Sequence, residues 1–100
     1  MYKVIDGITY DTRTAKRIAF YEFSSIGYYE WVYKVLFQTP DGNYFTYETG
    51  GCCTEYAVKV GNKMVGAHYH IFPANNEEAK RFLERYKPKL ALELFSDSYK

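Results

Sequence analysis

Residues 28–49 have the sequence YYEWVYKVLFQTPDGNYFTYET, which predicts a long β-hairpin and decides the fold of the chain. Pro40, Asp41 and Gly42 suit a tight turn, because proline presets φ and glycine accepts the left-handed conformation. Side chains alternate between the two faces of a strand, so the aromatic residues fall on both faces of this hairpin. We therefore expect one aromatic face to line the core and the other to meet a second layer, a partner or water.

The segment before this hairpin predicts a helix. Asp11 and Thr12 are favoured at a helix N-terminus, where their side chains accept hydrogen bonds from free backbone amides. One narrow apolar side follows at helical spacing, formed by Ala15, Ile18 and Ala19. We therefore expect an N-terminal helix over residues 12–23.

The end of the chain predicts a second helix. Asn75 and Glu78 have the spacing of a capping box. Apolar residues then recur at helical spacing, at Ala79, Phe82, Leu83 and Tyr86. We expect this C-terminal helix over residues 76–87, because Pro88 should end or kink it.

Together these elements predict an α+β fold. Its small antiparallel sheet, of about three to five strands, would have the Tyr-rich hairpin 28–48 at its centre and the helices 12–23 and 76–87 packed on it. Further short strands are expected near residues 2–5 and 68–72. The length of 100 residues fits a single domain, residues 1–100.

The segment 54–65 allows two interpretations. Thr54 could cap a short helix that runs through the residues after it. Alternatively, Tyr56–Val60 and Lys63–Val65 could flank a two-residue turn at Gly61 and Asn62 as a second hairpin. The β-branched residues of the segment favour the strand, whereas its start favours the helix.

The charge balance excludes some classes of partner. Thirteen basic and twelve acidic side chains nearly cancel, which argues against attachment to nucleic acid or membrane by net charge alone.

No apolar stretch approaches the roughly 20 residues of a membrane span, and the N-terminus has no apolar run typical of a signal peptide. We expect a cytoplasmic protein that does not enter the membrane.

Two adjacent cysteines and two nearby histidines are the candidates for metal binding or catalysis. Cys52 and Cys53 favour free thiols, because neighbouring residues make a poor disulfide. His68 and His70 lie two apart on an expected strand and could bind zinc or copper with a thiolate, or one could act as a base for a cysteine nucleophile. Nothing in the sequence fixes a further ligand or an orienting residue. We therefore expect no metal site, no cofactor and no catalytic residue, and hence no enzyme.

The aromatic hairpin is the best candidate for a partner-binding surface. Tyrosine supplies a large, stiff contact area and a hydroxyl group that tolerates water. Two faces and few covering elements should leave some rings exposed, and grouped exposed aromatics mark interaction sites. The candidate partner-binding residues are Tyr28, Tyr29, Trp31, Tyr33, Tyr44 and Tyr47. Aromatic or edge-strand contacts could also form a homodimer.

The C-terminal helix offers an alternative, nucleic-acid-binding site. Its basic side is formed by Lys80, Arg81, Arg85 and Lys87. Aromatic side chains elsewhere in the chain could stack on bases. Acidic residues share the same helix, so a solvated, mixed-charge face is the simpler interpretation.

Several motifs along the chain together resemble a known family. They are Tyr10-Asp11-Thr12-x-Thr14-Ala15, Leu36-Phe37-x-Thr39, Gly42-Asn43-Tyr44-Phe45, Gly50-Gly51-x-x-Thr54-x-Tyr56-Ala57, Gly61-Asn62, Ile71-x-Pro73 and Glu77-Glu78-Ala79. In these motifs the chain resembles short, mostly uncharacterised proteins from phages and mobile elements of Gram-positive bacteria. Phe72 stands where the family has a second isoleucine, and Phe82 lies near its usual tryptophan.

The resemblance implies a function as well as a local structure. Small proteins from such elements are often inhibitors of bacterial defence, including anti-CRISPR proteins that occlude a Cas effector. It therefore implies a non-enzymatic binding protein whose partner is a host protein such as a Cas effector, with a small nucleic-acid-binding regulator as the alternative. It also implies a short helix over Thr54 to Lys59 in place of the second hairpin.

Overall fold

The structure is a computed structural model that describes residues 1–23, 31–51, 58–61, 63–65 and 69–99. It confirms an α+β fold with a mainly antiparallel sheet. The strands are β1 (Tyr2–Ile5), β2 (Ile8–Asp11), β3 (Lys16–Phe23), β4 (Val32–Gln38), β5 (Tyr44–Gly50), β6 (Val58–Val60), β7 (Lys63–Val65) and β8 (His70–Ala74). The helices are α1 (Asn76–Tyr86), α2 (Pro88–Leu94) and the 3-10 turn η1 (Ser96–Ser98).

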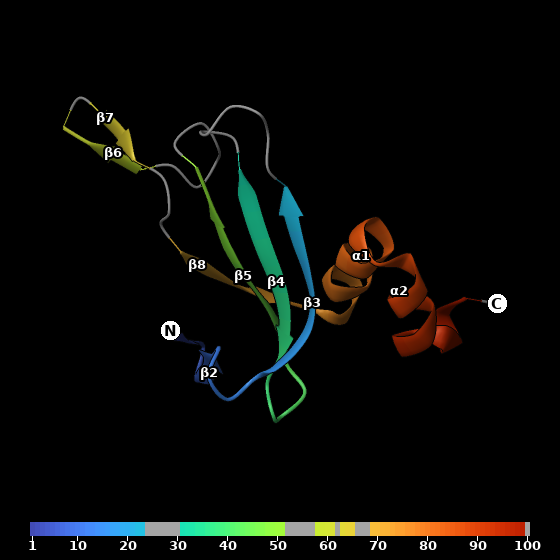
Figure 1. Cartoon of the computed structure of the whole chain (residues 1–100). Coiled ribbons are helices and arrows are strands. Elements are labelled where there is room, and N and C mark those ends of the chain that lie inside the picture. The colour runs from blue at the N-terminus through green and yellow to red at the C-terminus, as the bar shows by residue number, and fades with distance from the viewer. Residues whose placement is uncertain (24–30, 52–57, 62, 66–68, 100) are drawn as a thin grey trace.

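A four-stranded antiparallel sheet, in the order β3-β4-β5-β8, forms the centre of the molecule (Figure 1). Its two middle strands are the predicted hairpin, paired from Val32 opposite Gly50 to Gln38 opposite Tyr44. The β1–β2 hairpin packs on one face of the sheet, which we call the hairpin face. The helices α1 and α2 pack on the opposite face, which we call the helix face.

The predicted N-terminal helix over 12–23 is wrong, because Lys16–Phe23 forms the edge strand β3. Aromatic residues in this segment favour a strand, and pairing with β4 satisfies its backbone hydrogen bonds within the sheet. A β-bulge between Arg17 and Ala19 inserts Ile18 into the ladder. This extra residue interrupts the period-two alternation from which a strand is recognised in a sequence.

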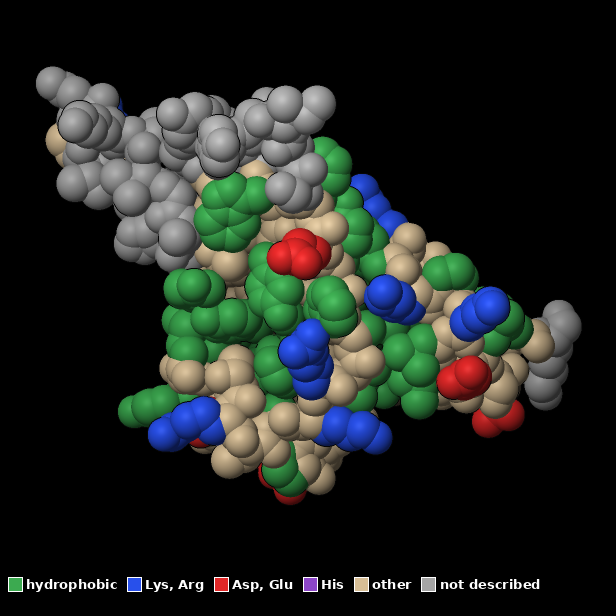
Figure 2. Space-filling model, viewed as in Figure 1, with side chains coloured by type: hydrophobic (Ala, Val, Ile, Leu, Met, Phe, Trp, Pro, Cys, Tyr) green, Lys and Arg blue, Asp and Glu red, His purple; other side chains and the backbone are tan. Residues whose placement is uncertain are grey.

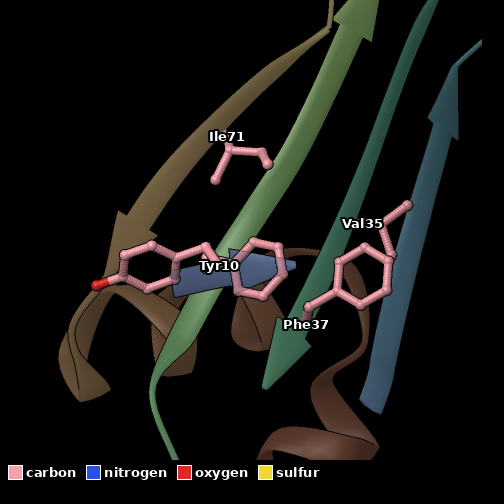
Figure 3. Packing of buried hydrophobic residues seen from close by; sticks show 5 residues of the cluster. Tyr10, Val35, Phe37 and Ile71 are labelled. Atoms are coloured by element: carbon pink, nitrogen blue, oxygen red, sulfur yellow. The ribbon is translucent and has the colours of Figure 1, made fainter. Parts of the chain in front are cut away.

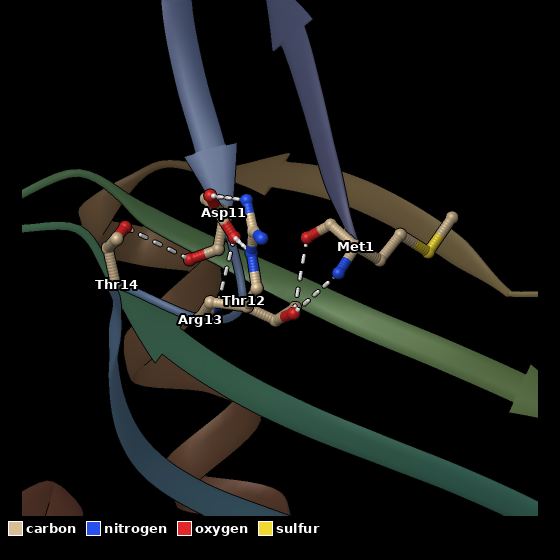
Figure 4. Close-up of polar contacts among 5 residues, drawn as sticks. All are labelled: Met1, Asp11, Thr12, Arg13 and Thr14. Carbon is tan, nitrogen blue, oxygen red and sulfur yellow. Dashed lines mark hydrogen bonds and ion pairs between the residues drawn. The ribbon is translucent and has the colours of Figure 1, made fainter.

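The residues expected to begin that helix form a turn instead. The Asp11 carboxylate accepts a hydrogen bond from the backbone N–H of Arg13 at 2.9 Å (Figure 4). The Asp11 carbonyl oxygen accepts one from the N–H of Ala15 at 3.0 Å. Hydrogen bonds from the Arg13 side chain and backbone lower the pKa of Asp11. Asp and Thr serve turns and helix caps through the same local hydrogen bonds, which explains the wrong prediction.

The hairpin-face core joins the β1–β2 hairpin to the sheet. Tyr10 of β2 lies edge-on to Phe45 of β5, with ring centroids 5.5 Å apart, and Phe45 stacks on Phe37 at 5.2 Å. Figure 3 shows Tyr10, Val35, Phe37 and Ile71, which come from β2, β4 and β8. Each such aromatic pair contributes about 1 kcal/mol beyond the area that it buries.

The helix-face core uses small residues to bring helices close to the sheet. Leu36 of β4 and Leu83 of α1 are fully buried. Around them lie three buried alanines, Ala19, Ala79 and Ala91. Because alanine has only a methyl side chain, the backbones of β3, α1 and α2 can approach one another closely, and the larger leucines fill the remaining space.

The predicted C-terminal helix is confirmed as α1. The Asn75 side chain accepts a hydrogen bond from the N–H of Glu78 at 2.8 Å, and the Glu78 carboxylate accepts one from the N–H of Asn75 at 3.1 Å. This reciprocal pair is the expected capping box. Pro88 occupies the first turn of α2, so the proline ends one helix and begins the next.

For the segment 54–65, the structure favours the hairpin interpretation over 58–65. β6 and β7 pair antiparallel, with Val58 opposite Val65 and Val60 opposite Lys63. Gly61, in the connecting turn, has a φ of +61°, which glycine adopts without strain. The short helix implied over 54–59 is wrong at residues 58 and 59, and its first four positions lie outside the described residues.

Neither helix found among the described residues is long and apolar enough to cross a membrane.

Candidate functional site

The strand register places one row of three residues side by side on the hairpin face. Glu22 of β3 lies opposite Tyr33 of β4, and Tyr33 lies opposite Thr49 of β5. The β5–β8 ladder ends with Glu48 opposite His70, and its continuation by one residue brings Tyr69 opposite Thr49. With Tyr69 added, four residues lie in line, so that the line is acidic at the Glu22 end and aromatic at the Tyr69 end, with the short threonine side chain between two tyrosines.

This row lines an open hollow of about 640 Å³ in the hairpin face. We call it the aromatic hollow; its lining residues are Arg17, Phe20, Glu22, Trp31, Tyr33, Tyr47, Thr49 and Tyr69. The space-filling view shows hydrophobic side chains gathered over the sheet, with basic and acidic side chains among them (Figure 2). The hollow combines five aromatic rings with charges of both signs.

The hollow exists because β5 places a short side chain, Thr49, at the end of this face. Phe45 is covered by Tyr10 of the β1–β2 hairpin. Tyr47 follows two residues later, and Thr49 two residues after that, because every second residue of a strand shares a face. The β1–β2 hairpin therefore covers the Phe45 end, whereas the Thr49 end lacks a large side chain.

The rings around the hollow are oriented by contacts with one another. Tyr47 and Tyr69 stack almost parallel, with centroids 5.1 Å apart and an interplanar angle of 10°. Phe20 and Tyr33 lie 6.3 Å apart at 40°. Tyr69 is 48% exposed and Phe20 37% exposed. These exposed rings are held in place before any partner arrives, which lowers the entropy lost on binding.

The hydroxyl groups at the hollow differ in their surroundings. Burial, followed by the charges that Tyr69 and Tyr33 would carry if ionised, raises the pKa of Tyr47, so its phenol stays neutral and can donate a hydrogen bond. Thr49 is only 2% exposed, and its Oγ1 has no hydrogen-bond partner among the described residues. A buried hydroxyl without a partner costs stability, so it suits a ligand-binding position better than a purely structural one.

The charges divide the hollow into two ends. The Arg17 guanidinium lies over the Phe20 ring at 4.6 Å, and the Lys87 ammonium lies 5.4 Å from the same ring. Glu22 lies two residues after Phe20 on the same face of β3. At about 3.3 Å per residue, its backbone is roughly 7 Å from that of Phe20, the ring that the two cations contact.

The structure brings together half of the predicted partner-binding residues. Trp31, Tyr33 and Tyr47 all line the aromatic hollow. Tyr44 does not belong with them, because it lies on the helix face, where its ring is 6.1 Å from that of Phe95. The remaining two residues of the set, Tyr28 and Tyr29, lie outside the described residues.

Sequence reasoning missed five residues of the hollow. They are Arg17, Phe20, Glu22, Thr49 and Tyr69. The sequence predicted a helix for the first three, so their position beside β4 could not be predicted. Thr49 lies at the end of a hairpin strand whose alternation already places it on the face of Tyr47, and that signal could have identified it.

The four basic residues proposed for nucleic-acid binding lie in and just after α1. Three of them are near rings of the protein itself: Lys80 is 4.7 Å from the Tyr99 ring, Arg85 5.4 Å from that of Tyr86, and Lys87 close to Phe20. Arg81 is exposed. Three of these four cations therefore already contact aromatic rings of the fold itself.

Within the described residues, no three His, Cys, Asp or Glu side chains gather in a group that could hold a metal ion. Three of the four metal candidates, Cys52, Cys53 and His68, lie outside these residues. His70 is described, and its ring stacks on Phe72 with centroids 5.8 Å apart.

Comparisons with protein-family models, curated proteins and solved structures found no match to this chain. The function is therefore inferred from the side chains of the site itself.

Proposed function

We propose that this chain is a non-enzymatic binding protein whose aromatic hollow docks onto a partner protein. The observation that carries the proposal is the gathering of five aromatic rings in one open hollow of the hairpin face. Trp, Tyr and Arg are the residue types that contribute most to binding energy at protein interfaces. All three types line this hollow.

The shape of the hollow favours a macromolecule over a small ligand. A small-molecule pocket usually encloses most of its ligand's surface, whereas this hollow is open and wide for its depth. A protruding segment of a protein could contact several rings at once while its remaining surface stayed in contact with solvent. The stacked pair Tyr47 and Tyr69 and the pair Phe20 and Tyr33 would form two sides of such a contact.

The resemblance described above supports a narrower form of the proposal. The partner would be a host defence protein, such as a Cas effector, that the protein inhibits by occlusion, as an anti-CRISPR protein from a phage or mobile element does in the cytoplasm of its bacterial host. Occlusion requires affinity and surface area only. It therefore fits a chain whose described residues offer a docking surface.

A site-directed cross-linking experiment tests the docking surface. A photo-reactive amino acid is placed at Tyr69, at the rim of the hollow, and separately at Leu92, which is 54% exposed on α2. Each variant is illuminated with a purified candidate Cas effector. The proposal predicts a covalent adduct from position 69 and little or none from position 92. Equal adducts from both positions, or none from position 69 in a complex that sizing shows to be intact, would contradict it.

An inhibition assay tests the narrower form. Expression of the wild-type chain should protect a phage from CRISPR interference in host cells, and Tyr69→Ala should reduce that protection more than Leu92→Ala. Low-salt binding of random oligonucleotides that is lost on substituting Lys80, Arg81, Arg85 and Lys87 together would instead support the nucleic-acid-binding regulator. Self-association that buries the same surface would appear as a dimer in sizing experiments.

A further inference from the structure

We propose that the Glu22 end of the aromatic hollow is a receptor for one basic side chain, an arginine or a lysine, presented by the partner protein. This inference rests on the proposed function and specifies its chemistry. The observation behind it is the row formed by Glu22, Tyr33 and Thr49, which the strand register places side by side. Each member of the row contributes a different part of the receptor.

The rings provide the walls of the receptor. Tyr33 and Tyr69 stand on either side of the short Thr49 side chain, because the continued register sets all three in one row. Neighbouring strands are about 4.8 Å apart, so the two rings rise from backbones roughly 10 Å apart. Trp31 lines the same hollow two residues before Tyr33. Faces of tyrosine and tryptophan attract cations through their negative π-electron clouds.

Glu22 provides a negative charge at the rim. It is exposed, and it makes no hydrogen bond or ion pair with the residues that the structure describes. Its neighbour across the ladder is Tyr33, not a lysine or arginine that would pair with it. A guanidinium lying between the rings could therefore form a charge-assisted hydrogen bond with a carboxylate that is still available.

Thr49 provides a short floor. Its side chain lines the hollow, whereas its Oγ1 is buried beneath the accessible surface and has no partner among the described residues. Because threonine is much shorter than tyrosine, it leaves room above it for the basic side chain of the partner.

The positive charge at the opposite end of the hollow repels a cation. It therefore determines which end the basic side chain of the partner occupies. Arg17 lines that end, with its guanidinium over the Phe20 ring, and the Lys87 ammonium, outside the lining of the hollow, lies 5.4 Å from the same ring. A basic side chain is therefore directed toward Glu22. An acidic side chain would instead have to place its charge beside an unpaired carboxylate to reach Thr49.

The chain offers a direct probe, because Trp31 is its only tryptophan and lines the hollow. N-acetyl-arginine amide is titrated into the full-length protein, at constant ionic strength, and Trp31 fluorescence is recorded. The matched neutral compound is N-acetyl-citrulline amide, and the matched anion is N-acetyl-glutamate amide. We expect saturable binding of the arginine compound with a millimolar dissociation constant, and much weaker binding of the other two.

Two variants identify the receptor groups. Glu22→Gln should raise the dissociation constant of the arginine compound about fivefold, because an exposed ion pair contributes little more than that. Glu93→Gln, which removes an exposed carboxylate on α2 outside the hollow, should leave it unchanged. Equal binding of the arginine and citrulline compounds, preference for the glutamate compound, or equal effects of the two variants would overturn the proposal.

The cross-linking test distinguishes failure of this inference from failure of the proposed function. A position-69 adduct without arginine-specific binding would contradict the cation receptor and support the docking surface. Absence of both the adduct and the arginine-specific binding would contradict both proposals. A partner that cross-links at position 69, and whose affinity falls when one of its own arginines or lysines becomes glutamine, would support both.

Discussion

Tyr33 and Thr49 lie directly opposite each other on β4 and β5, and the small threonine leaves the tyrosine ring without a cross-strand neighbour of its own size. This mismatch creates the hollow. On most sheets, cross-strand pairs fill the space above the backbone. Here the pair leaves it open, and the threonine hydroxyl oxygen is buried beneath it without a partner among the described residues.

Thr49→Val should raise the free energy of unfolding by about 1 kcal/mol, because it replaces an unpartnered buried hydroxyl with a methyl group of similar size. The matched control is Thr46→Val on the same strand, since the Thr46 hydroxyl donates to the Glu48 carboxylate. That variant should lose stability instead. Urea unfolding of both variants provides the measurement. A loss of stability in Thr49→Val equal to that in Thr46→Val would show that the hydroxyl is satisfied in the folded chain.

Tyr69→Ala should weaken partner binding by about 2 kcal/mol, as expected for an aromatic residue that contacts the partner directly. The cost to folding should be smaller, about 1 kcal/mol, because Tyr69 is half exposed and loses mainly its stacking on Tyr47. Calorimetric titration with the partner that cross-linking identifies gives the binding affinity of each variant. Leu92→Ala serves as the control. Unchanged affinity in Tyr69→Ala would place the interface elsewhere.

Leu83→Ala should destabilise the fold by about 3 kcal/mol, because it opens a cavity between α1 and the sheet. Leu83 is fully buried, whereas Leu92 is 54% exposed one helix further along the chain. Leu92→Ala should therefore change stability by about 0.5 kcal/mol or less. Thermal or urea unfolding compares the two. Similar effects would mean that α1 and α2 do not pack on the sheet as described.

The C-terminal turn should produce a late step in an alkaline titration. The Tyr99 hydroxyl donates to the Glu84 carboxylate at 2.7 Å. Partial burial, this hydrogen bond and the charges of Glu84 and Glu77 raise the pKa of Tyr99 to about 12. Since the unfolded value is about 10, the contribution to stability is complete below about pH 10 and is lost as the pH rises through about 12.

Absorbance of the tyrosinate form measures this titration. Tyr99→Phe should remove the latest step, whereas Tyr2→Phe, at an exposed position of β1, should leave it in place. Glu84→Gln should move the step toward lower pH, because it removes the negative charge that opposes ionisation of the phenol. A step near pH 12 that persists in Tyr99→Phe would assign it to another residue.

The elements with strong local signals could be predicted from the sequence. The turn at Pro40, Asp41 and Gly42 fixes the central hairpin, and the Gly42 N–H donates to the Thr39 carbonyl oxygen at 2.9 Å. The capping box and Pro88 fix the limits of α1. In each case residues close in sequence determine the conformation, so no knowledge of the tertiary structure is needed.

Prediction of the edge strand β3 requires knowledge of long-range strand pairing, which a local sequence pattern does not contain. The extra residue Ile18 hides the alternation, and the turn at Asp11 uses the same side-chain chemistry as a helix cap. Only pairing with β4 distinguishes the two conformations, and this pairing joins residues that are distant in sequence. The wrong assignment also concealed Phe20 and Glu22 as parts of the candidate site.

The site itself was predictable to the extent that strand alternation applies. Alternation along the two hairpin strands places Trp31, Tyr33 and Tyr47 on one face, and all three line the hollow. The same alternation places Tyr44 on the other face. The contribution of Tyr69 required the register of β8 against β5, which depends on tertiary packing.

A fluorine NMR measurement on Trp31 tests the central claim most directly. Because the chain contains one tryptophan, incorporation of 5-fluorotryptophan gives a single fluorine nucleus inside the aromatic hollow, and an unlabelled partner contributes no signal. Addition of the partner protein should shift and broaden this resonance in proportion to the complex formed. An unchanged resonance in a sample that sizing shows to be fully complexed would contradict the aromatic hollow as the docking surface.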